Sequence, residues 1–275
     1  MTASTHRQRL VEGGPIVLTV IAPCLNEEAN IPALVNRTLK VFDVMGVAAE
    51  LLLIDDGSSD GTWEAIREHG ARDTRVRGVR HASNLGIEHA WRSGLGAARG
   101  ESVCLIDADL QNQPEDIALL YETYMRGSDD IVQAVRHPIS PLERSLLLTR
   151  GLNTLLNTVF HTRLRDNKSG FIICSHDVLT HTLEHRYHYR YFQSLIGVAA
   201  RARGFTIGEM DTVFHHRHGG TSFLSRFPVL VSTRILVELM KFRVEVWLES
   251  RRSQTGRRRG WRIPTIQGKA VGSES

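Results

Sequence analysis

The sequence predicts an α/β fold in which a mostly parallel β-sheet carries helices on both faces. Short runs of β-branched residues alternate with helical patterns through the first half of the chain, which is the pattern of repeated β-α units. The length of 275 residues, with 41% hydrophobic and 23% charged residues, suits one large globular domain. Carboxylates also gather where the predicted strands end, at the edge where such sheets bind ligands.

The first half of the chain supplies four strands, each followed by a helix. Apolar β-branched runs predict the strands, and three- to four-residue apolar spacing predicts the helices, of which the first two end at a glycine. The predicted strands cover 15–23, 50–57, 75–81 and 102–110. The helices that follow them cover 30–46, 60–70, 87–100 and 114–126.

The second half is predicted to complete the same domain. A strand over 130–136 precedes a helix-rich stretch over 141–160, a strand over 169–175, a helix over 191–204 and a last strand over 205–216. No internal repeat interrupts this order. We therefore expect one folded domain over 15–222.

The two ends of the chain differ from this domain. Residues 1–14 lack the apolar core of a signal peptide and are expected to be flexible. Residues 223–249 predict a long amphipathic helix whose polar stripe is Arg234, Glu238, Lys241, Glu245 and Glu249. Residues 250–275 form a basic tail that is expected to be disordered.

The charge distribution argues against a nucleic-acid-binding protein. The chain has 34 Lys and Arg against 30 Asp and Glu, but the tail from Ser250 onward holds the excess and leaves a slightly acidic body. The three cysteines, Cys24, Cys104 and Cys174, lie in apolar stretches without a CxxC pair, so we expect buried free thiols in a reducing compartment.

The fourth strand pattern ends in "DADLQ", which places Asp107, Asp109 and Gln111 at alternate positions. While a strand lasts, alternate side chains share a face, and two carboxylates on one face repel unless a cation lies between them. A helix-capping loop is the alternative, since Pro114 begins a helix pattern. "APCLNEE" after the first strand and "DDGSSDGT" after the second bring further polar groups to the same edge.

Taken together, these motifs make the chain resemble the family 2 glycosyltransferases with the GT-A fold. Within that family it is similar to the polyprenyl-phosphate and dolichyl-phosphate sugar transferases. The resemblance runs from about Pro15 to Phe227 and rests on "VIAPCLNEEANI", "LLLIDDGSSDGT", "NLGIEHAWRSGLGAARGE", "IDADLQNQPEDI", "DNKSGF" and "FHHRHGGTS", in that order.

The resemblance implies a site for a nucleoside diphosphate sugar, with UDP or GDP as the nucleotide. Asp107, Asp109 and Gln111 would hold Mg²⁺ or Mn²⁺ on the diphosphate, which such a cation neutralises as the glycosidic bond breaks. The donor nucleotide would contact Pro23, Leu25, Asn26, Glu27, Asp56, Asn84 and Asp107. With Asp107 and Asp109, Arg217 would complete the catalytic set, lying over the phosphates as an arginine fork.

Two features of the sequence bear on the acceptor. Relatives that glycosylate a hydroxyl group carry a Glu-Asp pair before the last strand, whereas this chain has "YHYRYF" over 187–192. A phosphate acceptor is already ionised and needs no base. We therefore expect a polyprenyl phosphate or another anionic acceptor, bound by Arg136, Arg190, Arg217 and Ser222.

The chain also departs from its relatives in the third and fourth loops. Ser83 stands where many relatives have an arginine, which puts a phosphate or acceptor contact there in doubt. Asn112 and Gln113 make the loop after the fourth strand less acidic than usual. Zinc is not expected, because His181, His185 and His188 have helical spacing but no paired motif completes a site.

The sequence predicts a cytoplasmic enzyme that binds reversibly to the inner face of the cytoplasmic membrane through 223–259. Packing of that helix on the domain, or on the partner in a homodimer, is the alternative. An inverting, single-step transfer is expected, because no nucleophilic side chain is implied. A soluble small-molecule acceptor and a catalytically silent sugar-nucleotide-binding protein remain open alternatives.

Overall fold

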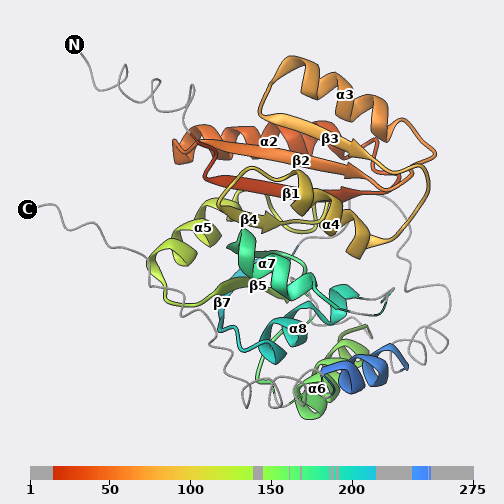
Figure 1. Ribbon diagram of the computed structural model, residues 1–275. Coiled ribbons are helices and arrows are strands. Elements are labelled where there is room, and N and C mark those ends of the chain that lie inside the picture. Colours follow the sequence, from red (N-terminus) through yellow and green to blue (C-terminus); the bar gives the residue numbers. More distant parts are fainter. Residues whose placement is uncertain are drawn as a thin grey trace, which may run out of the picture.

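A computed structural model describes residues 15–138, 145–160, 162–167, 169–185, 187, 189, 192–214, 237–246 and 248. Its centre is a seven-stranded sheet with the order β3-β2-β1-β4-β6-β5-β7. Figure 1 labels every strand of this sheet except β6. The strands are β1 (Leu18–Cys24), β2 (Ala49–Asp55), β3 (Val76–Arg80), β4 (Ser102–Leu105), β5 (Ile131–Pro138), β6 (Ile172–Ser175) and β7 (Ile207–Phe214). The predicted α/β fold is confirmed.

The sheet is parallel except at β6. The pairs β1–β2, β2–β3, β1–β4 and β5–β7 run parallel, whereas β6 runs antiparallel to both of its neighbours, β4 and β5. Parallel neighbours need a crossover connection, and the helices between the strands supply it. The β-α units of the first half therefore form the parallel half of the sheet, with the order β3-β2-β1-β4.

Helices cover both faces of the sheet. They are α2 (Ile31–Met45), α3 (Thr62–Arg72), α4 (Ile87–Ala97), α5 (Asp116–Arg126), α6 (Ser145–Phe160), α7 (His176–Leu183) and α8 (Ile196–Ala202), with a 3₁₀ turn η1 (Phe192–Ser194). One apolar core joins the sheet to α2, α3 and α5, and a second joins it to α4, α7 and α8. β1 contributes to both cores because its side chains alternate: Val20 enters the first and Ile21 the second.

Two predicted elements differ from the structure, and one helix was not predicted. The fourth strand ends at Leu105 instead of residue 110, and the helix predicted over 191–204 is divided into η1 and α8. Helix α7 was not predicted as an element; its N-cap is Ser175, whose Oγ accepts from the Val178 N–H at 3.2 Å. All three cysteines are buried free thiols, as expected.

Part of the predicted C-terminal helix is present, since residues 237–246 are helical. Leu239 and Phe242 are 1% and 0% exposed and enter the core beneath α4, α7 and α8. The Phe242 ring lies 5.9 Å from that of Phe160, so the segment lies beside α6 (Figure 1). Glu245 was predicted in the polar stripe but is 3% exposed. Its buried carboxylate accepts the Tyr189 hydroxyl at 2.5 Å.

In the part of the chain that the structure describes, no helix is long and apolar enough to cross a membrane.

Candidate functional site

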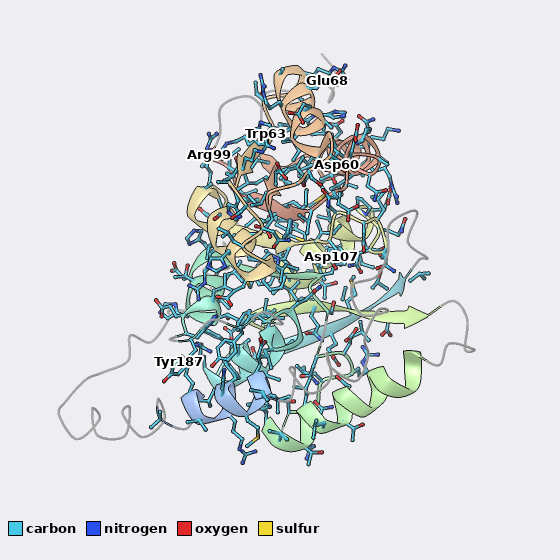
Figure 2. The ribbon with its side chains drawn as sticks, turned by 90° about the vertical axis from the view of Figure 1, so that its right-hand side faces the viewer. Asp60, Trp63, Glu68, Arg99, Asp107 and Tyr187 are labelled. Atoms are coloured by element: carbon cyan, nitrogen blue, oxygen red, sulfur yellow. The ribbon has the colours of Figure 1, made fainter. Side chains whose placement is uncertain are left out.

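The carboxyl ends of β1, β2 and β4 meet at one edge of the sheet. β1 pairs in parallel with both β2 and β4, with Cys24 opposite Asp55 and Ile21 opposite Leu105. The loops that follow these strands therefore start side by side, and the loop after β3 joins them beyond β2. Figure 2 labels Asp60, from the loop after β2, and Asp107, from the loop after β4. This is the edge at which open α/β sheets bind ligands.

Hydrogen bonds lock the loops after β1 and β2 together. Asn26 has a positive φ of 56° and its N–H donates to the Ser58 hydroxyl at 2.9 Å. The Asn26 side-chain oxygen accepts from the Ser59 N–H at 2.9 Å, and the Glu27 N–H donates to Thr62 Oγ1 at 2.8 Å. The predicted nucleotide residues Asn26 and Glu27 thus lie in a fixed loop. Beside them, Leu25 is 41% exposed and Pro23 partly buried.

Asp56 holds the loop after β3. The residue is 4% exposed, and its carboxylate accepts from the Leu85 N–H at 2.9 Å and the Gly86 N–H at 2.8 Å. It also contacts His81 Nδ1 at 2.7 Å, and His81 Nε2 lies 2.8 Å from Ser93 Oγ. Asp56 therefore orients the loop that carries the exposed Asn84. Any contact of this carboxylate with a nucleotide must share an oxygen with these bonds.

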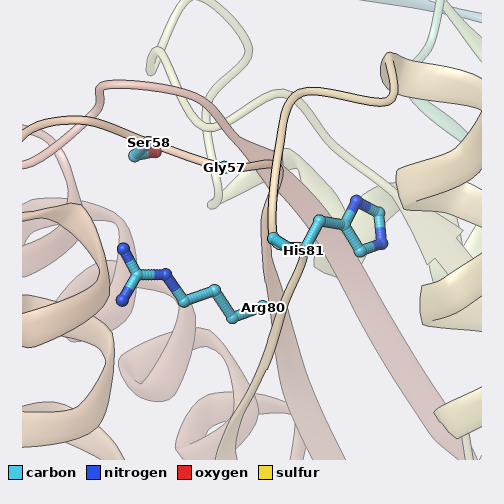
Figure 3. A pocket seen from close by; sticks show the side chains of 5 residues that line it. Gly57, Ser58, Arg80 and His81 are labelled. Atoms are coloured by element: carbon cyan, nitrogen blue, oxygen red, sulfur yellow. The ribbon is translucent and has the colours of Figure 1, made fainter.

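A cavity of about 340 Å³ opens between the loops after β2 and β3. Its lining is Gly57, Ser58, Arg80, His81 and Ala82, as Figure 3 shows for four of them. The Arg80 Nε lies 3.1 Å from the fully buried Asp55 carboxylate, and its guanidinium lies over the Trp63 ring at 5.7 Å. Neither Arg80 nor His81 was predicted as a site residue. The only sequence signal is a basic pair at the end of the third strand.

The loop after β4 places its polar side chains differently from the prediction. Because β4 ends at Leu105, strand alternation does not align Asp107, Asp109 and Gln111. The chain turns at Leu110, which has a positive φ of 59°, and the Gln111 N–H donates to Asp109 Oδ1 at 3.1 Å. Asp109 is 6% exposed, whereas Asp107 and Gln111 are partly exposed.

Gln113, one of the two unusual residues of this loop, anchors it to helix α2. Its amide N–H donates to the Leu110 carbonyl at 3.0 Å, and its amide oxygen accepts from Arg37. The Arg37 Nε also donates to Glu115 Oε1 at 2.8 Å, and this bond holds the pKa of the Glu115 carboxyl below its usual value. Gln113, which departs from the usual sequence of this loop, thus makes a structural contact with α2.

These residues fit a hard divalent cation. Asp107, Asp109 and Gln111 offer carboxylate and amide oxygens, the ligand type that Mg²⁺ and Mn²⁺ prefer. Two carboxylates lie in one short loop, one of them almost fully buried, and a cation between them would offset their mutual repulsion. Over the described residues, no group of three or more His, Cys, Asp or Glu side chains is arranged to hold a metal ion.

The buried carboxylate of Glu88 fixes the segment after α7, where the sequence predicts acceptor contacts. Glu88 at the start of α4 contacts His185 Nε2 at 2.8 Å, accepts from Arg92 Nε at 2.9 Å and from the Tyr189 N–H at 3.3 Å. Burial alone would raise the pKa of Glu88, but these bonds and the charge of His185 hold its pKa below the usual value. His185 thus serves a structural contact with Glu88, and sequence spacing gave no signal for it.

The "DNKSGF" motif contributes a second polar network. Asn167 is fully buried, and its N–H and side-chain amide both donate to Asn153 Oδ1 of α6 at 2.8 Å. Gln133 of β5 donates to the Asp166 carbonyl at 2.7 Å. The motif thus ties α6 to β5 and to the start of β6.

Several predicted acceptor residues cannot be placed. Arg190, Arg217 and Ser222 lie outside the described residues. Arg136 lies near the carboxyl end of β5, opposite Thr212 of β7, and only its backbone is described. Of the segment predicted to face the acceptor, Tyr187 is 49% exposed (Figure 2), and Tyr189 is buried against Glu245.

Comparison with known proteins identifies a family for this chain. The family described as "Glycosyl transferase family 2" matches residues 19–183. Undecaprenyl-phosphate 4-deoxy-4-formamido-L-arabinose transferase from Aeromonas hydrophila is 41% identical over 114 residues, covering 41% of this chain and 35% of the relative. The uncharacterized glycosyltransferase YkcC of Bacillus subtilis is 36% identical over 121 residues, covering 44% and 37%. The chain thus spans about a third of the length of these curated relatives.

Among solved structures, glucosyl-3-phosphoglycerate synthase from Mycobacterium tuberculosis is similar in fold. Its complex with Mn²⁺ and UDP-glucose superimposes with a TM-score of 0.63 at 20% identity, covering 88% of this chain and 83% of that one. Its complex with Mg²⁺ and UDP gives a TM-score of 0.59 at 21% identity, covering 80% and 77%.

Proposed function

This chain belongs to glycosyl transferase family 2, and we propose that it transfers a sugar from a nucleoside diphosphate sugar to a polyprenyl phosphate. The observation that carries the proposal is the edge at which the loops after β1, β2 and β4 meet. The carboxylates of Asp107 and Asp109 lie in the last of these loops. Relatives named as undecaprenyl-phosphate sugar transferases support the choice of acceptor.

The loops after β1 and β2 would receive the nucleotide. Their mutual hydrogen bonds fix the backbone of Asn26 and Glu27 before a ligand arrives, which lowers the entropy cost of binding. Asp56 fixes the loop bearing Asn84 in the same way. The cavity beside Gly57 and Arg80 adds space next to these loops for part of the donor.

Asp107, Asp109 and Gln111 would hold a divalent cation on the donor diphosphate. When bound, the cation neutralises the negative charge that grows on the leaving diphosphate. Asp109 is buried and braced by the Gln111 N–H, and Gln113 and Arg37 fix the loop that carries it. Arg217 is proposed to add a bidentate phosphate contact.

The acceptor side lacks a carboxylate in the segment over 187–192. A phosphate acceptor suits this composition, because its oxygen attacks the anomeric carbon without giving up a proton. Arg136, Arg190 and Ser222 are proposed to bind that phosphate. With no nucleophilic side chain required, attack from the side opposite the leaving diphosphate gives inversion at the anomeric carbon.

The test of this function is a screen of UDP- and GDP-linked sugars against a short polyprenyl phosphate, with Mn²⁺ or Mg²⁺ and product detection by mass. We expect one donor to give a phosphate-linked glycolipid of inverted anomeric configuration, and chelation of the metal to stop the reaction. A product that keeps the donor configuration excludes single-step transfer. Turnover only with a soluble acceptor supports the small-molecule alternative. Donor binding without hydrolysis or transfer supports a silent binding protein.

Membrane contact is a second part of the proposal, and it is carried by the outer face of the helix over 237–246. While Leu239, Phe242 and Glu245 face the domain, the opposite side exposes an apolar stripe: Val237, Met240, Val244 and Leu248, at 54%, 57%, 51% and 38%. Exposed Lys241 and Arg243 flank this stripe. Apolar side chains between basic ones are typical of helices that lie on anionic membranes.

We expect the full-length protein to float with vesicles that contain anionic lipid, and Val244→Asp to reduce the floating fraction several-fold, because a carboxylate in the stripe opposes insertion. Val44→Asp is the matched control, since Val44 is 85% exposed on α2 and should not matter. Equal flotation of all three proteins, or of none, contradicts membrane contact through this stripe. A monomer–dimer shift on Val244→Asp would instead assign it to a homodimer.

A further inference from the structure

We propose that Gln193 positions Asp107 and selects an acceptor that is already ionised; the second half rests on the proposed function. The Gln193 side-chain N–H donates to both Asp107 oxygens, at 3.4 Å to Oδ1 and 3.3 Å to Oδ2. These residues are 86 positions apart in the chain, and the contact joins the acceptor-side turn η1 to the loop after β4.

Both described neighbours of Gln193 in the turn, Phe192 and Leu195, are buried and held by contacts. Phe192 is fully buried, its ring stacks on His185 with centroids 4.4 Å apart, and His185 is held by Glu88. The Leu195 N–H donates to the Phe192 carbonyl at 2.7 Å and closes the turn. Gln193 itself is partly exposed, so its amide can face a ligand as well as Asp107.

Gly170 of the "DNKSGF" motif leaves room for this amide. A Cβ at position 170 would lie 2.7 Å from Gln193 Nε2 and 3.4 Å from Trp91 Cζ2. Any larger residue at this position therefore pushes the Gln193 amide aside. The absence of a side chain at Gly170 thus explains how the Gln193 amide can lie there.

The chemistry of an amide decides what it can do beside Asp107. The amide N–H donates a hydrogen bond and carries no charge. It therefore orients the Asp107 carboxylate without adding a positive charge that would repel a cation there. An amide cannot take a proton from a hydroxyl group as a general base does. A phosphate oxygen has no proton to lose: its lone pair bonds to the anomeric carbon, and the bonding pair leaves with the nucleoside diphosphate. Gln193 therefore suits an anionic acceptor and not a neutral alcohol.

The experiment uses Gln193→Glu, which has the same shape but adds a carboxylate within about 3.5 Å of Asp107. We measure Mn²⁺ affinity in the presence of UDP by electron paramagnetic resonance, and the affinity for farnesyl phosphate by calorimetry, with farnesol as the neutral probe. We expect Mn²⁺ to bind several-fold tighter, because a further oxygen ligand is offered, and farnesyl phosphate to bind about 10-fold weaker or more, because like charges repel. A purely structural role would not move the two affinities in opposite directions.

Two further variants separate position from charge. Gln193→Met keeps the length but removes the N–H, and Gly170→Ala displaces the amide; both should weaken Mn²⁺ binding without the tightening expected for Gln193→Glu. Gly151→Ala in α6, where a Cβ meets nothing within 4 Å, is the control for Gly170→Ala. Thermal unfolding verifies that each variant is folded.

Unchanged farnesyl phosphate affinity in Gln193→Glu, or gain of farnesol binding comparable to that of the phosphate, overturns the inference. So does wild-type protein that binds Mn²⁺ and UDP but not farnesyl phosphate. Wild-type protein that binds neither Mn²⁺ nor UDP overturns the proposed function itself.

Discussion

Asp109→Asn is expected to lower sugar transfer by about 10²- to 10³-fold, the range typical of losing one group that stabilises charge in the transition state. Asparagine keeps the shape of aspartate and can still accept the Gln111 N–H with its side-chain oxygen. What it removes is the negative charge that attracts a divalent cation. The loss should therefore fall on turnover and Mn²⁺ affinity and not on the fold.

The measurement pairs initial rates over a Mn²⁺ titration with thermal unfolding of the same protein. Asp43→Asn is the matched control, because Asp43 is a 62% exposed carboxylate that pairs with Arg75 on the surface of α2. Exposed ion pairs contribute little to stability, so this variant should behave as the wild type in both assays. Loss of stability in Asp109→Asn in proportion to its loss of activity would indicate a structural carboxylate.

Gly57→Ala is expected to destabilise the protein by about 3 kcal/mol, combining a strained backbone with overpacking. Gly57 has a φ of 75°, and a Cβ there would lie 2.4 Å from the Ser83 carbonyl carbon and 2.6 Å from the Asn84 nitrogen. Both are backbone atoms, which cannot move aside as a side chain can. The loops after β2 and β3 must then separate, which opens the cavity and weakens nucleotide binding.

Chemical denaturation and UDP titration measure this effect, and two other glycines provide controls. Gly46 has a similar φ of 64°, but a Cβ there would meet nothing within 4 Å, so Gly46→Ala isolates backbone strain at about 1 kcal/mol. Gly96 lies within α4 with open space around it, and Gly96→Ala should be neutral or slightly stabilising. If Gly57→Ala costs no more than Gly46→Ala, close approach of the two loops does not matter for stability.

The sequence alone determined the half of the fold that depends on local patterns. Apolar runs and helical spacing identified β1 to β4 with their helices, and strand-end motifs indicated the ligand edge, because a parallel β-α repeat brings these ends together. The same local signals identified the apolar faces of the C-terminal helix. They did not show that Glu245 turns inward, since its partner, Tyr189, lies 56 residues away.

Only the tertiary structure shows the contacts between residues that are far apart in the sequence. The place of β6, antiparallel between β4 and β5, depends on how the chain returns to the sheet. The family resemblance implies that Asp56 contacts the nucleotide, and only the tertiary structure shows that its carboxylate accepts from the backbone N–H groups of Leu85 and Gly86. Gln193 reaches Asp107 only because Phe192 is buried and Gly170 has no side chain. Local patterns report which face a residue prefers, whereas the partner it meets there is set by the packing of segments far apart in the chain.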